Sequence, residues 1–446
     1  MEGNIMTYEE KLQQYKDWIF RRSAYQMALA IIGIDKQTVA PSAGAAYRDE
    51  RSAYLAGELF SIETDPAMVQ LLKELKDDPQ IDGDNKRAIE LYYKQAMDTM
   101  CIPKEEFVAY QKLRDESFDA WIKAKSQSDY SIFEPYLKKI IEVSKKMYRY
   151  RNSDKNLYDQ MLDDYEPGMT QEKYDVFFTA LKERLVPLIQ KVTKAKQKNE
   201  AFLHQEFPIE DQKKFMIQLL AYLHFDSSWG YQNESEHPFT SWTCENDCRT
   251  TTKYVTNDVV SAVLSTVHEV GHAYYEHNVD PKYDGMILSE GISSGMHESQ
   301  SRLCENYLAR TTAFWKYHYP KLQETFPTQL GNVSIEEFYE AINVAKPSFV
   351  RTEADELTYP LHILVRYEIE KGLFNGIIST EGLNETWNKM YKEYLGVDVP
   401  NDKVGILQDV HWSDGSFGYF PTYALGTAFA AQYMHAMRKD LDVDTL

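Results

Sequence analysis

Apolar residues recur at three- and four-residue spacing along most of this chain of 446 residues. Two examples are residues 132–143 (IFEPYLKKIIEV) and 177–189 (FFTALKERLVPLI), where charged residues fill positions between the apolar ones. Because an α-helix turns every 3.6 residues, this spacing predicts amphipathic helices that each bury one face. The chain shows no fixed-period repeat and no Gly/Ser-rich linker. We therefore expect a mainly α protein with one domain over residues 1–446, cleft into two lobes.

One region departs from this helical spacing. Residues 239–256 (FTSWTCENDCRTTTKYVT) are rich in Thr, Tyr and Trp, which favour strands, and they carry a polar turn at residues 245–247. This pattern predicts a small β-hairpin. Asn257 and Asp258 follow as N-cap residues, and the apolar stripe over residues 259–267 predicts a helix that ends near Pro281.

The predicted helix contains the sequence His268-Glu269-Val-Gly-His272. Helix positions i and i+4 point to the same side, so both imidazoles can bind one cation, and Glu269 can reach a water on that cation. With eleven histidines in the chain, such a pattern arises by chance in roughly 2 of 100 similar chains. The alternative is a pair of histidines that only cap or pack the helix. We favour a hydrolytic metal site.

A catalytic zinc site needs a third protein ligand and an open position for water. The stretch at residues 287–309 (ILSEGISSGMHESQSRLCENYLA) places Glu298 on a second predicted helix. Other candidates for the third ligand are His297, Glu305 and His277. A three-histidine site of the H-E-x-x-H-x-x-G-x-x-H type is excluded, because residues 275, 278 and 279 are Tyr, Asn and Val. We favour a ligand set of two histidines and Glu298.

The net charge and the cysteine content indicate which partners and which cellular compartment to expect. A formal net charge of −20 opposes binding to phosphate backbones and anionic lipids, so we expect neither nucleic acid nor a membrane as a partner. Four cysteines are too few for a disulfide framework in a chain of this length, and we expect them to be reduced. The first residues contain no basic region followed by an apolar core, which favours a cytoplasmic protein.

Six short motifs occur in order between residues 237 and 412, and together they resemble the carboxypeptidase Taq family of zinc metallocarboxypeptidases. The motifs are His237-Pro-Phe, Asp247-x-Arg249-x-Thr251, His268-Glu269-x-x-His272, His297-Glu298-Ser299-Gln300, Val350-Arg351-x-x-Ala354-Asp355 and Gly405-x-x-Gln408-Asp409-x-His411-Trp412. The resemblance implies a large helical peptidase fold around a deep central groove, similar to angiotensin-converting enzyme and the neurolysin-like oligopeptidases, with the small sheet near the active site. It also implies one zinc ion per chain, or cobalt, and a homodimer that removes single C-terminal residues from peptides with broad specificity.

Several residues within 237–423 are candidates for the chemistry of peptide hydrolysis. Glu269 is the predicted general base, which takes a proton from water and passes it to the leaving amine. His411 and Tyr423 are candidate catalytic donors to the oxyanion, and Tyr419 is a further candidate that contacts substrate. His237 either hydrogen-bonds the substrate or anchors the turn before the hairpin.

Removal of a terminal residue requires a group that binds the free carboxylate, and an arginine does so bidentately. Arg351 and Arg249 are the candidates. Either arginine could instead form an ion pair within the protein. For Arg351 the obvious partner is Asp355, which lies four residues further along an expected helix. We expect Asp247 and Asp409 to orient neighbouring groups, as carboxylates do for imidazoles at metal sites.

Two other activities remain open at this stage. A dipeptidase or an endo-acting zinc oligopeptidase could use the same metal site and would need no group to bind a terminal carboxylate. A helical peptide-binding protein without activity is the third interpretation, and the intact ligands and Glu269 disfavour it.

Overall fold

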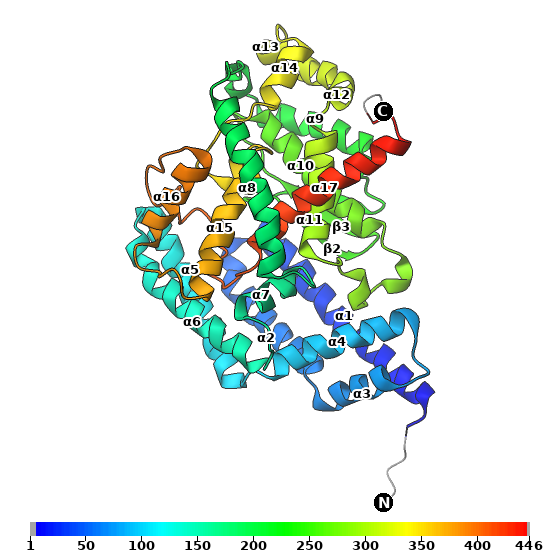
Figure 1. The fold of residues 1–446 in the computed structure, drawn as a ribbon. Helices are drawn as coiled ribbons and strands as arrows, with labels where there is room; N and C mark the ends of the chain where they lie inside the picture. Colours follow the sequence, from blue (N-terminus) through cyan, green and yellow to red (C-terminus); the bar gives the residue numbers. More distant parts are fainter. Residues whose placement is uncertain (1–5, 444–446) are drawn as a thin grey trace, which may run out of the picture. The chain divides into compact units, whose positions relative to one another are not determined.

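A computed structural model describes residues 6–443 of the chain (Figure 1). This part of the chain contains seventeen α-helices and one three-stranded sheet, which confirms the predicted mainly α fold with a small sheet. The chain divides into two compact units. The first unit runs to Cys101 and resumes at Gln205–Ile292, and the second comprises Ile102–His204 and the residues from Ser293 onward.

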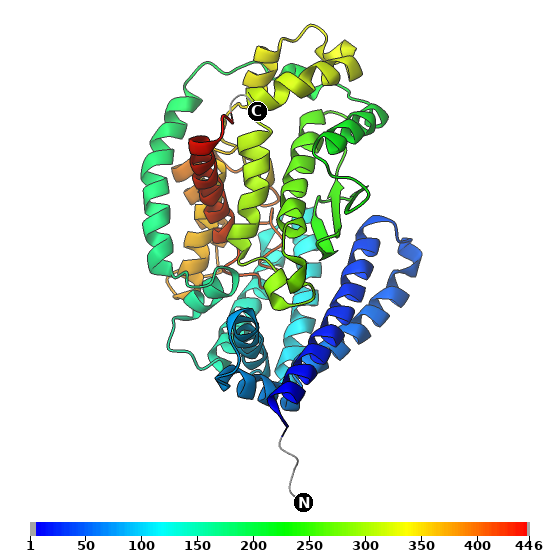
Figure 2. The ribbon, with the colours of Figure 1, turned by 90° about the vertical axis from the view of Figure 1, so that its right-hand side faces the viewer.

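The first unit contains six helices and the sheet. Its helices are α1 (Tyr8–Thr38), α2 (Ala45–Glu63), α3 (Pro66–Asp77), α4 (Gly83–Met100), α9 (Ile209–Tyr222) and α10 (Val259–His277). Helices α1 and α2 lie side by side as a long hairpin (Figure 2). Trp18 of α1 packs edge-on against Tyr92 of α4, with ring centroids 4.9 Å apart, inside a core that α3 completes.

The sheet of the first unit has the strand order β1 (Gly230–Glu234), β3 (Asp247–Thr252), β2 (Thr240–Cys244). Strands β2 and β3 are antiparallel, which confirms the predicted hairpin, and β3 is parallel to β1. Strand β1 was not expected, because its sequence GYQNE lacks the alternation of apolar and polar residues that marks a strand. The sheet packs against α10 through β2 and β3, so it fixes the position of the helix that carries the histidine pair.

Helix α10 begins where the sequence predicted. The side chain of Asp258 accepts a hydrogen bond from the backbone N–H of Ser261, and the helix ends at His277, before Pro281. Val263, Val267 and Val270 recur at helical spacing and are at most 3% exposed. Burial of this apolar stripe is the main stabilising contribution to the position of α10.

The second unit contains the other eleven helices. They are α5 (Lys104–Gln127), α6 (Glu134–Tyr150), α7 (Leu157–Tyr165), α8 (Gln171–Thr193), α11 (Ser294–Arg302), α12 (Thr312–Thr325), α13 (Pro327–Leu330), α14 (Ile335–Ile342), α15 (Tyr359–Phe374), α16 (Leu383–Leu395) and α17 (Phe420–Asp440). Helix α8 covers the segment 177–189 and helix α6 covers all but the first two residues of the segment 132–143, for which the spacing predicted helices. Helix α15 is buried over nearly its whole length and packs against α6, α7, α8, α16 and α17.

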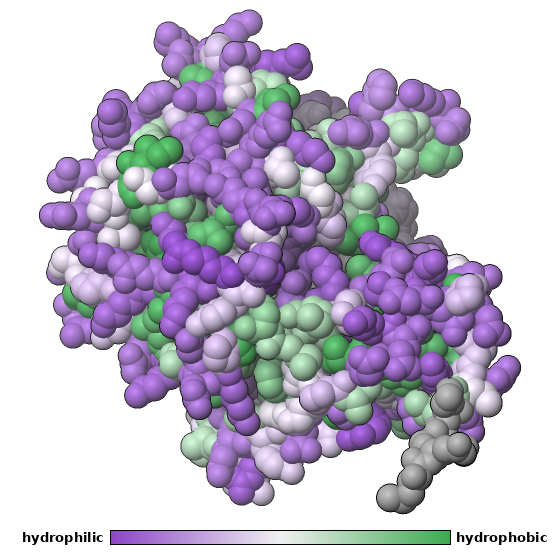
Figure 3. Space-filling model, turned by 60° about the horizontal axis from the view of Figure 1, so that its bottom comes forward, coloured by the Kyte–Doolittle hydropathy of each residue, from purple (hydrophilic) through white to green (hydrophobic). Residues whose placement is uncertain are grey.

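The face of the molecule in Figure 3 is largely hydrophilic, with apolar patches between the polar side chains. This appearance agrees with a composition in which 26% of residues are charged. Across residues 6–443 we find no helix that combines the length and the apolar character required to cross a bilayer.

Candidate active site

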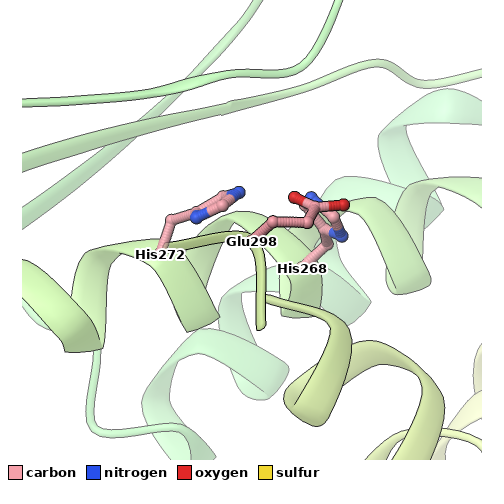
Figure 4. A group of neighbouring side chains, drawn as sticks. All are labelled: His268, His272 and Glu298. Atoms are coloured by element: carbon pink, nitrogen blue, oxygen red, sulfur yellow. The ribbon is translucent and has the colours of Figure 1, made fainter. Parts of the chain in front are cut away.

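His268 and His272 on α10 and Glu298 on α11 form a group that can hold a metal ion. One ligand atom from each residue lies within 4.8 Å of the other two (Figure 4). Two imidazole nitrogens and a carboxylate oxygen are the donor set of a common class of hydrolytic zinc site, so these residues fit a divalent ion. Within residues 6–443 no other group of three such side chains is close enough to hold one.

The other candidates for the third ligand, His297, Glu305 and His277, are outside this group. The ring of His277 stacks on Trp229 at 3.9 Å, and its Nδ1 lies 2.7 Å from the backbone oxygen of Glu245. Glu305 accepts a hydrogen bond from Arg302 at 3.2 Å. His277 and Glu305 therefore have structural contacts of their own.

Neighbouring groups hold the carboxylate of Glu298, which is 6% exposed. Arg302, one turn further along α11, donates from Nε to Oε1 at 2.6 Å, and the hydroxyl of Ser301 lies 3.1 Å from Oε2. On α17, a Cβ at Gly426 would lie 2.8 Å from Cγ of Glu298, closer than such atoms pack. The absence of a side chain at Gly426 therefore allows α17 to lie directly against the Cβ and Cγ atoms of Glu298. The sequence signal for Arg302 was its i+4 spacing from Glu298.

The start of α11 is also held in place. Ser293 caps the helix by accepting from the backbone N–H of Met296, and the buried carboxylate of Glu166 accepts from the backbone N–H of Gly295 at 3.0 Å. Burial raises the pKa of Glu166. A carboxylate at a helix N-terminus complements the partial positive charge there and satisfies a free N–H group. Nothing in the local sequence pointed to Glu166, which is distant in the chain.

Glu269 is buried on α10 beside the histidine pair, and it is 7% exposed. The hydroxyl of Thr240, at the start of β2, lies 2.6 Å from Oε2 of Glu269 and 2.9 Å from its backbone oxygen. Because a hydroxyl has one hydrogen, these two acceptors share it. Thr240 thus orients the predicted general base. The sequence offered one signal for this role, which is that Thr240 directly follows the His237-Pro-Phe motif.

His411, Tyr419 and Tyr423 come together in the second unit, where α17 begins. The rings of His411 and Tyr419 stack with centroids 5.6 Å apart, and the Tyr423 hydroxyl lies 3.4 Å from His411 Nε2. Burial lowers the pKa of His411 to about 4 and raises the pKa of Tyr423 well above its usual value. Burial and the nearby charge of Glu298 also raise the pKa of Tyr419. Near neutral pH the imidazole is therefore uncharged and both phenols keep a proton that they can donate.

Arg351 is buried and forms an ion pair with Asp409. Its Nε and Nη2 lie 3.0 and 2.9 Å from Asp409 Oδ1, and Arg366 donates to Asp409 Oδ2 from Nε at 2.7 Å. Burial alone would raise the pKa of Asp409, but the two guanidinium groups outweigh it and hold this pKa well below its usual range. The internal ion pair, the alternative role of Arg351, is thus observed, but with Asp409 and not with Asp355, the partner that helical spacing indicated. Residues Arg351–Glu353 form a 3-10 helix, and the carboxylate of Asp355 instead accepts from the hydroxyl of Thr358 at 2.8 Å.

Replacement of Asp409 by Asn would leave two buried guanidinium groups without a carboxylate. We expect the free energy of unfolding to fall by about 3–5 kcal/mol at neutral pH, measured by urea denaturation. Because the folded-state pKa of Asp409 is lowered, its contribution is present above the unfolded-state pKa of about 4 and is lost as the pH falls further. The difference between parent and variant should therefore shrink in acid.

A matched control is Asp398→Asn, at an exposed aspartate that pairs with Lys392. We expect this variant to differ from the parent by less than about 1 kcal/mol. An Asp409→Asn variant as stable as the parent would contradict the role of the aspartate as the charge that balances both arginines.

Arg249 has the more accessible guanidinium of the two candidate arginines. It pairs with Asp247 through Nε at 2.7 Å and Nη2 at 2.8 Å, and its side chain is 30% exposed, against 8% for Arg351. Asp247 and Asp409 therefore orient neighbouring side chains, as the sequence analysis expected. Their partners are arginines, however, and not the imidazoles of the metal site. The side chain of His237 is exposed, and its backbone oxygen accepts from the hydroxyl of Ser235 at 2.7 Å, in the turn between β1 and β2.

Comparisons with known proteins identify the family of the chain. The family model described as Carboxypeptidase Taq (M32) metallopeptidase matches residues 14–446. Carboxypeptidase 1 of Bacillus subtilis (strain 168) is 42% identical over 439 residues, which cover 98% of this chain and 87% of that protein. Thermostable carboxypeptidase 1 of Thermus thermophilus is 35% identical over 435 residues, 94% of this chain and 85% of that one. The crystal structure of the M32 carboxypeptidase from Deinococcus radiodurans R1 matches with a TM-score of 0.94 at 32% identity, covering 98% of this chain and 89% of that chain.

Proposed function

Since the chain belongs to the carboxypeptidase Taq (M32) metallopeptidase family and is thus a metal-dependent peptide hydrolase, we propose that it removes single C-terminal residues from peptides with broad specificity. The observation that carries this proposal is the group of His268, His272 and Glu298, with Glu269 on the same helix as the two histidines. The relatives named above are carboxypeptidases, which gives no support to a dipeptidase or an endo-acting oligopeptidase.

The proposed ion is zinc, with cobalt as a possible substitute, and one ion per chain. His268, His272 and Glu298 would hold it, because imidazole and carboxylate donors in this number suit zinc and leave a position open for water. When bound, such an ion supplies Lewis-acid chemistry: it lowers the pKa of water toward about 7 and polarises a peptide carbonyl.

The protein's own groups would move the protons. A carboxylate oxygen of Glu269 accepts a proton from the attacking water and then donates it to the leaving amine. The hydrogen bond from Thr240 fixes the orientation of that carboxylate. Tyr423 and the neutral imidazole of His411 are the proposed donors to the tetrahedral oxyanion, where one such donor contributes about 2.7–4 kcal/mol to the stability of the transition state.

Substrate binding involves the remaining candidates. Arg249 is the first candidate to bind the terminal carboxylate, because its guanidinium is the more exposed, and Arg351 is the second. Tyr419 and His237 are proposed to contact the peptide. We also propose a homodimer, from the resemblance to the family, and a cytoplasmic location, because four cysteines in 446 residues are too few for a disulfide framework.

The direction of cleavage is tested with one N-blocked peptide prepared with a free C-terminal carboxylate and with a C-terminal amide. We expect mass spectrometry to show the first shortened one residue at a time from its C-terminus, and the second intact. The physical reason is that only the free carboxylate can pair with an arginine. Chelator-treated protein is the control for metal dependence. Equal cleavage of both peptides would contradict the proposed exopeptidase activity.

A further inference from the structure

Glu370 is a carboxylate with no exposed surface in the second half of α15, and none of the six sequence motifs includes it. A carboxylate with no water contact must obtain its hydrogen bonds from protein groups. Glu370 has three: Trp412 Nε1 donates to Oε1 at 2.7 Å, the backbone N–H of Gly418 donates to Oε2 at 2.8 Å, and the hydroxyl of Tyr158 donates to Oε2 at 2.8 Å.

Two of these donors lie at opposite ends of one loop. Trp412 directly follows His411, and Gly418 directly precedes Tyr419, so the loop 412–418 starts and ends beside two of the proposed active-site residues. Both ends meet at the same carboxylate. The rings of His411 and Tyr419 stack just outside these two anchored positions.

The backbone at Gly418 supports the same interpretation. Its φ of +90° is a conformation that glycine adopts easily, and a Cβ there would lie 2.8 Å from the backbone oxygen of Met161. The loop therefore turns tightly against α7 immediately before α17 begins at Phe420. In this turn the backbone N–H of Gly418 donates to Glu370.

Helix α15 also holds the segment on the other side of His411. Arg366 precedes Glu370 by four residues, so the two side chains share one face of α15. Arg366 pairs with Asp409, two residues before His411, whereas Glu370 binds Trp412, the residue after it. His411 thus lies between two positions that a single buried helix fixes.

We propose that Glu370 is a positioning residue for hydrolysis: by binding both ends of the loop 412–418 it sets the orientation of His411 and Tyr419 toward the reacting carbonyl. This inference rests on the proposed function. Glu370 itself would not touch the substrate. Burial raises its pKa to about 7, although its three donors and Arg366 lower it, which reflects the cost of an ionised group at this depth.

The test uses Glu370→Gln in the full chain, with steady-state kinetics on a peptide that has a free C-terminus. Gln keeps the size of the side chain but replaces one acceptor oxygen by an NH2 group, so the loop loses at least one anchor. We expect kcat to fall about tenfold with KM changed less than about twofold, because a displaced donor stabilises the transition state less and the substrate equally well. Metal content should equal that of the parent.

Glu368→Gln is the matched control on the same helix. Glu368 accepts a hydrogen bond from the hydroxyl of Tyr394 on α16, outside the loop 412–418, so kcat and KM should stay within about twofold of the parent. Tyr158→Phe removes the third donor to Glu370 but leaves both loop anchors, and it should lower kcat by less than about threefold. If Glu370→Gln does not fold, Trp412→Phe tests the proposal instead, because it removes the donor at one end of the loop: kcat should fall severalfold with KM changed less than about twofold, and an unchanged kcat would contradict the inference.

Two results would overturn the inference. One is a folded Glu370→Gln variant with the kcat of the parent. The other is a fall in kcat that is fully explained by a smaller fraction of folded protein at the assay temperature. Thermal unfolding measures that fraction, and a purely structural role of Glu370 predicts that kcat falls by the same factor. Absence of carboxypeptidase activity in the parent would instead contradict the proposed function, so the two failures are distinguishable.

Discussion

The variant Glu269→Gln is expected to lose peptide turnover by a factor of about 100 to 10,000 while it still binds one metal ion per chain. The amide of Gln cannot accept a proton from water, and general acid–base catalysis contributes a factor of this size. The side chain is not among the three proposed ligands, so metal binding should survive. Turnover is measured with a chromogenic blocked dipeptide, and metal content by mass spectrometry of the desalted protein.

Two outcomes would contradict the role of Glu269. Turnover equal to that of the parent would show that another group accepts the proton. Loss of the metal together with turnover would show that Glu269 supports the ligands and is not the base. Thermal unfolding of the variant is the control, because Gln can still accept the hydrogen bond from Thr240 through its amide oxygen.

His272→Ala is expected to abolish both tight metal binding and detectable turnover. With one imidazole removed, two protein ligands remain, and a hydrolytic zinc site requires three. Dialysis of the parent against a chelator should have the same effect on turnover, and added Zn²⁺ or Co²⁺ should restore the parent but not the variant. The measurement is the number of ions bound per chain before and after addition.

His277→Ala is the matched control, since it removes an imidazole from the same helix but outside the ligand group. It should bind one ion per chain and hydrolyse the peptide, with some loss of stability from the broken stacking on Trp229. If His277→Ala loses the ion and His272→Ala retains it, the assignment of ligands is wrong.

The features that sequence could predict are those set by residues close together in the chain. The spacing of His268 and His272 on one helix, the cap at Asp258 and the hairpin of β2 and β3 are all of this kind. Each follows from local periodicity or from a side chain that bonds a backbone group two or three residues away.

The partner of Arg351 shows why other features could not be predicted. Asp355 was the obvious choice at helical spacing, but the chain forms only a 3-10 turn at Arg351–Glu353, and Asp409 reaches the guanidinium from a distant segment. Thr240 and Glu370 are similar cases. Their contacts depend on how elements pack in three dimensions, which periodicity along the chain does not encode.

Segments of the two compact units alternate along the sequence, because each unit consists of two separate stretches of the chain. Met286, Ile287 and Leu288 pack against the core formed by α1, α3 and α4, so that core stays incomplete until the ribosome has reached residue 288. At typical elongation rates this delay after residue 101 is on the order of ten to forty seconds. During that interval the apolar surface that these three side chains cover in the folded protein is exposed to solvent.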